Sequence, residues 1–196
     1  MTPVHTQEPA QAAARSAPRG RGATVWLTGL PSAGKTTLAR ALAERLRARG
    51  RPVEILDGDE IRLFLSAGLG FSREDRDTHV RRVGFVAQKL AAHGVTVLAP
   101  VIAPYAASRA AVRAHHAAYD TDFVEVHVST PAEVCGERDV KGLYALQAAG
   151  RLTGLTGIDD PYEEPRDPEL RVATTGRTVA ACTARLHGFL TERGLA

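Results

Sequence analysis

The sequence TVWLTGLPSAGKTT, residues 24–37, joins a short apolar run to a glycine-rich turn that contains a lysine. The run is β-branched and apolar without alternation, which predicts a strand buried on both faces. Over residues 36–49 apolar side chains recur at helical spacing, and Gly50 and Pro52 end that segment. The sequence therefore predicts a buried strand, a glycine turn and a helix in direct succession.

The turn matches the pattern G-x-x-x-x-G-K-[ST], in which backbone N–H groups and a lysine cradle phosphate groups. Gly29 and Gly34 permit the backbone conformations that this cradle needs, and the helix N-terminus adds partial positive charge. Lys35 supplies a point charge for the phosphates, and the Thr36 hydroxyl can ligate Mg²⁺. We predict binding of a nucleoside triphosphate with Mg²⁺. The predicted nucleotide-binding residues in the turn are Gly29, Leu30, Pro31, Ser32, Ala33, Gly34, Lys35, Thr36 and Thr37.

The rest of the chain alternates predicted strands with predicted helices, which indicates an α/β fold: a doubly wound parallel sheet with helices on both faces. Further strands are predicted at residues 53–56, 95–102, 123–128 and 170–173, and further helices at residues 80–92, 109–116, 131–135 and 179–193. Residues 137–167 are polar, rich in Gly and Pro and without a strong period, so we expect a mobile lid that excludes water from the site. Residues 1–22 lack large apolar side chains and predict a flexible tail, which leaves residues 23–196 as one domain.

Composition excludes several classes of protein. The chain has 196 residues, 44% of them apolar, which suits a single domain with a proper core. No apolar run is long enough to cross a membrane, and a net charge of +3 does not indicate a nucleic-acid partner. The two cysteines match no metal spacing, so a reducing, cytoplasmic setting is expected. Only three of the 25 Lys and Arg residues are Lys, and the chain has no Asn.

A second candidate site lies in the sequence LDGDEIR, residues 56–62, at the end of the second predicted strand. Doubly wound sheets bind ligands at the carboxyl ends of their strands, where Asp57 and Asp59 would stand beside the phosphate-binding turn. A carboxylate there can accept the proton of an acceptor hydroxyl or hold the metal, and Arg62 can pair with an anion. The alternative is an acidic turn in which Asp59 caps the following helix. A GTPase is excluded by the lack of an N-K-x-D motif, and the polar late segment is typical of a small-molecule kinase.

Together these segments resemble adenylyl-sulfate kinases (APS kinases) over about residues 24–169. The resemblance rests on GLPSAGKTT, LDGDxxR, LGFSxEDR, VRRVGxVA, a PY turn, KGLY and TGIDDPYE, which occur in this order. It implies a P-loop NTPase fold and transfer of the γ-phosphate of ATP, with Mg²⁺, to the 3′-hydroxyl of adenosine 5′-phosphosulfate (APS). The products would be ADP and PAPS, the activated form of sulfate. It also implies a cytoplasmic kinase that is a homodimer.

The resemblance assigns roles to individual residues. Asp57 and Lys35 would be catalytic, and Thr36 and Asp57 would hold the metal. Arg138 would lie near the ATP phosphates, Phe71 would stack on the adenine of APS, and Lys141 would help to close the lid. The residues expected to bind APS are Asp59, Arg62, Phe71, Arg76, His79, Ile102, Ala103, Lys141, Leu155 and Thr156.

The sequence departs from the family pattern around the acceptor. Glu60 and His79 stand where the family commonly has Asn, and Ala103 and Ala106 replace Ser and Arg. Leu155 replaces an aromatic residue that clamps the adenine. These changes leave open a divergent relative that phosphorylates another adenosine-like or sulfated nucleotide in a specialised pathway. A non-enzymatic nucleotide-binding regulator is disfavoured, because the residues expected to act on phosphate are all present.

Overall fold

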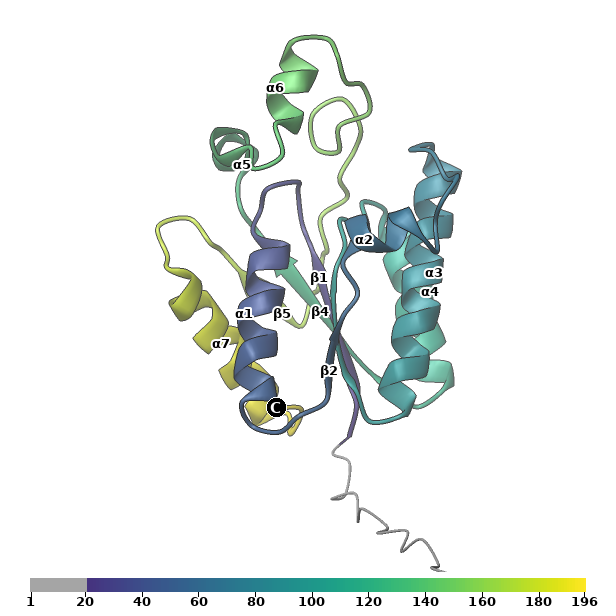
Figure 1. The fold of residues 1–196 in the computed structure, drawn as a ribbon, viewed down its shortest axis with the longest axis vertical. Coiled ribbons are helices and arrows are strands. Elements are labelled where there is room, and N and C mark those ends of the chain that lie inside the picture. The colour runs from purple at the N-terminus through teal and green to yellow at the C-terminus, as the bar shows by residue number, and fades with distance from the viewer. Residues whose placement is uncertain (1–20) are drawn as a thin grey trace, which may run out of the picture.

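The computed structural model describes residues 21–196, so the predicted tail, apart from Arg21 and Gly22, lies outside the described residues. A five-stranded parallel sheet with strand order β2-β3-β1-β4-β5 forms the centre (Figure 1). Its strands are β1 (Ala23–Thr28), β2 (Val53–Ile55), β3 (Thr96–Pro100), β4 (Asp122–Val128) and β5 (Leu170–Val172). β1 lies in the middle, and all six of its residues are buried. Because every pair is parallel, the carboxyl ends of all five strands meet at one edge.

Helices cover both faces of this sheet, as the alternating pattern predicts (Figure 1). On one face lie α1 (Lys35–Arg47) and α7 (Val179–Glu192), whose Leu42 and Leu186 are fully buried in one hydrophobic cluster. On the other face lie α3 (Arg73–Ala92) and α4 (Ala106–Ala118), which enclose a second cluster that includes Trp26 and Val83. The predicted doubly wound α/β fold is confirmed.

Several elements differ from the sequence prediction, and α4 begins three residues before its predicted start. α3 starts seven residues before residue 80, at a Ser72 cap whose hydroxyl accepts the Asp75 N–H at 3.1 Å. The early turns of α3 carry charged side chains, so no apolar period marks them. A short helix that the prediction lacks, α2 (Gly58–Leu63), follows β2, and its cap is Asp57 rather than Asp59. The predicted strand over residues 95–102 is also longer than β3.

The segment predicted as the lid, residues 137–167, is called the lid below and contains one complete short helix. α5 (Ala132–Arg138) leads into it and α6 (Leu143–Ala148) lies within it, and the chain then returns to β5 without a further helix. In Figure 1 α5 and α6 lie beyond the edge where the strands end, above the turn that follows β1. Across residues 21–196, no helix combines the length and apolar character needed to cross a membrane.

Close packing of α3 on α4 gives a stability prediction. A Cβ at Gly84 would approach Cγ2 of Val112 to 2.6 Å, whereas a Cβ at Gly188 of α7 meets nothing within 4 Å. We expect Gly84→Ala to lower the free energy of unfolding by about 1–3 kcal/mol through overpacking. The control Gly188→Ala should raise it by about 1 kcal/mol, because alanine favours the helix. Urea unfolding measures the free energy of unfolding of both variants. Equal changes in the two variants would contradict the close approach of α3 to α4.

Candidate active site

The phosphate-binding turn lies between β1 and α1, and two glycines permit its course. A Cβ at Gly29 would lie 2.6 Å from the carbonyl oxygen of Val128 at the end of the neighbouring β4. Gly34 caps α1 with φ 105°, in the region that side chains disfavour. The turn thus opens at the N-terminus of a helix, where anions are stabilised.

Lys35 lies buried inside this turn. Its Nζ donates to the carbonyl oxygens of Gly29 at 2.9 Å and Leu30 at 2.7 Å. Burial, followed by the positive charge of Lys141, lowers the pKa of Lys35 to about 8. The side chain therefore stays mostly protonated at neutral pH, and a phosphate anion is the partner that would favour its charged form most.

The turn is supported from behind by side chains of which the sequence analysis selected only Arg138. The carbonyl oxygen of Ala33 accepts from Thr130 Oγ1 at 2.9 Å and from Arg138 Nη1 at 3.3 Å. Arg138 also donates to Thr174 Oγ1 at 2.8 Å. From the lid, the Tyr144 hydroxyl donates to the Pro31 carbonyl at 3.2 Å. Arg138 therefore lies next to the turn, as expected, and its guanidinium group binds the backbone of the turn.

A hydroxyl and a carboxylate meet at the front of the turn. Thr36 Oγ1 donates to Asp57 Oδ2 at 2.8 Å, and the other oxygen of Asp57 accepts the Asp59 N–H at 3.0 Å. The second bond fixes the carboxylate as the cap of α2. Hard oxygen ligands of this kind suit Mg²⁺, which usually takes one or two protein oxygens and completes its shell with water and phosphate. The pair fits the metal site expected from the sequence.

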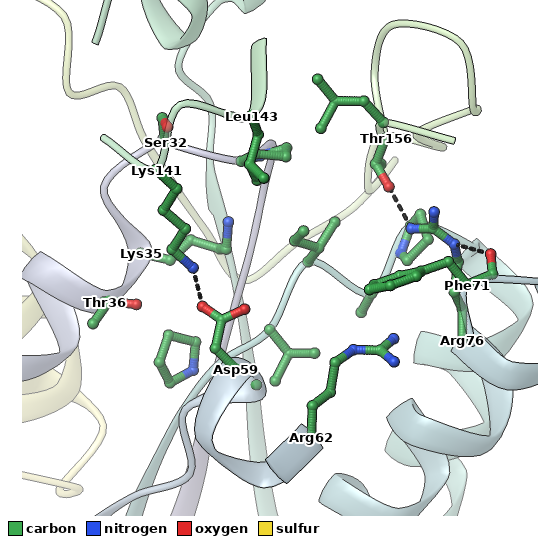
Figure 2. A pocket seen from close by; sticks show the side chains of 18 of the residues that line it. Ser32, Lys35, Thr36, Asp59, Arg62, Phe71, Arg76, Lys141, Leu143 and Thr156 are labelled. Atoms are coloured by element: carbon green, nitrogen blue, oxygen red, sulfur yellow. Dashed lines mark hydrogen bonds and ion pairs between the residues drawn. The ribbon is translucent and has the colours of Figure 1, made fainter. Parts of the chain in front are cut away.

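A cavity of about 370 Å³ extends from this turn to the start of α3 and lies beneath the lid (Figure 2). All ten residues expected to bind the acceptor line it: Asp59, Arg62, Phe71, Arg76, His79, Ile102, Ala103, Lys141, Leu155 and Thr156. The phosphate-binding turn contributes Pro31, Ser32, Gly34, Lys35, Thr36 and Thr37. Other expected residues support the cavity without lining it: Gly29, Leu30, Ala33, Asp57 and Arg138. Lid residues that the sequence analysis missed also line it, namely Val140, Leu143, Leu152, Thr153 and Gly154.

Far from the phosphate-binding turn, the cavity has a flat aromatic surface between two cations. The Phe71 ring is 66% exposed, and the guanidinium carbons of Arg62 and Arg76 lie 4.6 Å and 5.6 Å from its centroid. Leu155, from the lid, lines the same cavity. Apolar surface next to guanidinium groups suits a planar base that carries anionic groups.

Arg76 does more than line the cavity, because its guanidinium binds the lid. Nη1 donates to Thr156 Oγ1 and Nη2 to the Gly154 carbonyl, both at 2.6 Å, while Nε donates to the Phe71 carbonyl at 2.8 Å. Nη2 also lies 3.1 Å from Asp160 Oδ2. Figure 2 shows two of these bonds. In this structure Arg76 connects α3 to the lid, a role that the sequence analysis did not foresee.

The return of the lid also packs on the phosphate-binding turn. The Asp159 carboxylate accepts the N–H groups of Gly154 at 2.9 Å and Leu155 at 2.5 Å, which closes this part of the lid on itself. Gly157 has φ 91°, and a Cβ there would collide with the Leu30 side chain. The sequence TGIDD, residues 156–160, therefore makes a tight turn that meets the phosphate-binding loop directly.

An ion pair joins the two walls at the mouth of the cavity. Lys141 Nζ, from the lid, contacts Asp59 Oδ2 on α2 (Figure 2). Both side chains are exposed, and exposed pairs contribute little to stability. Such a pair can exchange partners readily when an anion enters between the walls.

His79 is buried under the acceptor end of the cavity. Its Nδ1 lies 2.9 Å from the Ser66 hydroxyl, which is also buried. Burial, followed by the positive charge of Arg62, lowers the pKa of His79 to about 4. The imidazole that stands in place of the family asparagine is therefore a neutral hydrogen-bonding group at physiological pH.

Comparisons with known proteins agree with this geometry. Residues 21–173 match the family model for adenylylsulphate kinase. An adenylyl-sulfate kinase of Synechococcus sp. (strain JA-3-3Ab) is 51% identical over 176 residues, which cover 87% of this chain and 98% of that protein. The structure of the Mycobacterium tuberculosis APS kinase in complex with AMPPNP and APS superposes with a TM-score of 0.85 at 42% identity, covering 88% of this chain and 99% of that chain. A hexameric APS kinase from Thiobacillus denitrificans gives a TM-score of 0.69 at 39% identity, covering 90% of this chain and 30% of that one.

The buried environment of His79 gives a pH prediction. We expect its ring signal in NMR to titrate with a midpoint near pH 4, assigned by its loss in His79→Gln. Because the folded state binds this proton less readily than the unfolded chain, stability falls as the pH drops from about 6.5 towards about 4. His79→Gln should make that fall smaller. A midpoint near the ordinary value of about 6.5 would contradict the burial argument.

Proposed function

The chain belongs to the adenylylsulphate kinase family, and we propose that it transfers the γ-phosphate of ATP to the 3′-hydroxyl of APS, giving ADP and PAPS. The observation that carries this proposal is the single cavity that joins the phosphate-binding turn to an aromatic surface flanked by arginines. One end has the chemistry of a triphosphate site, and the other suits an adenine with anionic groups.

On the donor side, the turn and Lys35 hold the phosphates of ATP. Bound Mg²⁺ would neutralise charge on the phosphate oxygens, and Thr36 and Asp57 would hold it. Lys35 leaves the Gly29 and Leu30 carbonyls for the phosphates, which favour its charged form. Asp57, fixed as the cap of α2, takes the proton of the acceptor hydroxyl in this proposal.

On the acceptor side, Phe71 and Leu155 take the two faces of the adenine, and Arg62 and Lys141 meet the phosphosulfate. Lys141 exchanges Asp59 for the incoming anion, which draws the lid over the substrates. His79 offers a neutral ring to the adenosine half of APS. The lid then excludes water, so that phosphate passes to APS rather than to solvent.

Transfer is direct in this proposal. Ala103 lines the cavity and has no hydroxyl, so it offers no oxygen for a covalent phosphoenzyme. In-line transfer between two bound substrates needs positioning and charge neutralisation, and the cavity supplies groups for both.

The organisation of the protein completes the proposal. We assign residues 23–196 to one kinase domain in which residues 137–167 act as the mobile lid. A homodimer stays a prediction, and the hexameric relative shows that larger assemblies occur in the family. Both cysteines are free and buried, which suits the cytoplasmic setting predicted from sequence.

The acceptor is tested by ADP release from Mg²⁺–ATP with a panel of acceptors: APS, adenosine 5′-phosphate, adenosine and related sulfated nucleotides. We expect APS to give by far the highest kcat/KM. Turnover with another nucleotide but not with APS would favour the divergent relative, for which the buried His79 and the aliphatic Leu155 are the motivating observations.

We expect Asp57→Asn to lower kcat by about 10²–10⁴-fold while ATP binding changes little, because the amide cannot accept the proton. Glu60→Gln is the matched control, since Glu60 lies exposed in the same turn and does not line the cavity. Steady-state kinetics and nucleotide titration measure both variants. Normal turnover by Asp57→Asn would show that another group accepts the proton.

A further inference from the structure

Arg109 has no place in the proposed chemistry, yet it lies at the junction of the cavity and the lid. It stands in the first turn of α4 and is buried. Each nitrogen of its guanidinium has an acceptor: Nε donates to Glu125 Oε1 at 2.8 Å, Nη1 to the Ala103 carbonyl at 2.7 Å and Nη2 to the Glu163 carbonyl at 2.6 Å. The planar guanidinium group of arginine can donate hydrogen bonds in these three directions at once.

Two of the three acceptors are backbone groups of segments that form the site. Ala103 lines the cavity at φ 44°, which a residue with a side chain adopts only when its surroundings hold it there. Glu163 belongs to the return of the lid, and its N–H donates to the Pro104 carbonyl at 2.8 Å. Its carboxylate also accepts the Ala106 N–H at 2.7 Å. Arg109 therefore joins the loop after β3 to the lid.

Tyr162 extends this junction to the end of β1. Its hydroxyl lies 3.0 Å from Thr28 Oγ1, which in turn donates to the Ile102 carbonyl at 2.5 Å. The Arg109 guanidinium carbon lies 6.0 Å from the centroid of the Tyr162 ring. The residue before the phosphate-binding turn, the acceptor loop and the lid are thus held by one group of side chains, in which Thr28 and Arg109 are buried.

We propose that Arg109 is a positioning residue for the acceptor nucleotide. It holds Ala103 in its unusual conformation and keeps the return of the lid, at Glu163, against the wall that Ile102, Ala103 and Pro104 provide. Arg109 does not itself line the cavity and acts through these backbone groups. The identity of the acceptor in this inference rests on the proposed function. The contacts that Arg109 makes at the junction do not depend on it.

Arg113 provides a matched control on the same helix. It lies 3.2 Å from Glu125 Oε2 and donates to Glu169 Oε2 at 2.8 Å. These two carboxylates belong to residues that do not line the cavity. Replacement of Arg113 therefore disturbs the same ionic cluster without touching the acceptor loop or Glu163.

The test compares Arg109→Lys with Arg113→Lys by steady-state kinetics. Lysine keeps the charge beside Glu125 but cannot reach both carbonyls, so we expect Arg109→Lys to raise KM for APS by about tenfold and leave KM for ATP unchanged. Arg113→Lys should change neither constant. An unchanged KM for APS in Arg109→Lys, or an equal rise in both variants, would overturn the proposal.

Hydrogen exchange at the Glu163 amide is the second measurement. Arg109→Lys should speed this exchange and Arg113→Lys should not, because of these two arginines it is Arg109 that binds Glu163. If the unmodified chain does not turn over APS, the proposed function fails, and exchange still decides whether Arg109 holds the junction. If Arg109→Lys does not fold, Tyr162→Phe loosens the same junction, and the proposal then requires it to raise KM for APS alone.

Discussion

The site depends on the convergence of parallel strands at the carboxyl end of β1. Thr28 ends that strand, and its hydroxyl donates to the Ile102 carbonyl beyond β3 and meets the Tyr162 hydroxyl of the lid return. The next residue, Gly29, opens the phosphate-binding turn against the end of β4. One buried edge thus fixes the donor loop, the acceptor loop and the lid relative to one another. Direct phosphoryl transfer needs this fixed spacing more than it needs any single reactive group.

The arginines and lysines in this region differ in the groups that they bind. Arg76 and Arg109 are buried, and their guanidinium groups bind the lid and the acceptor loop. Lys35 binds two backbone carbonyl groups of its own turn, and Lys141 binds one exposed carboxylate. The planar guanidinium suits several fixed acceptors, whereas an ammonium group can change partners. Two of the three lysines in the chain lie at the positions where the proposed function needs a change of partner.

The sequence predicts the part of the site that is local. Residues 24–37 are contiguous, so the strand, the turn and the helix could be predicted together. The resemblance of separate motifs selected ten residues that were expected to bind the acceptor, and all ten line one cavity. Contacts between distant segments could not be predicted. Arg76 and Thr156 are 80 positions apart, and Arg109 and Glu163 are 54 apart, and nothing in either local pattern indicates the partner. The early turns of α3 and the six-residue α2 were missed because neither carries an apolar period.

The central claim is that one cavity holds ATP and APS together and directs the γ-phosphate to the 3′-oxygen of APS. The most direct measurement is ³¹P NMR of the products formed from Mg²⁺–ATP and APS, with the γ-phosphate carrying ¹⁸O. We expect an ¹⁸O-labelled phosphomonoester at the 3′-oxygen of APS, in amounts equal to ADP. Labelled inorganic phosphate alone, or a labelled phosphoryl group attached to any other oxygen of the acceptor, would contradict it.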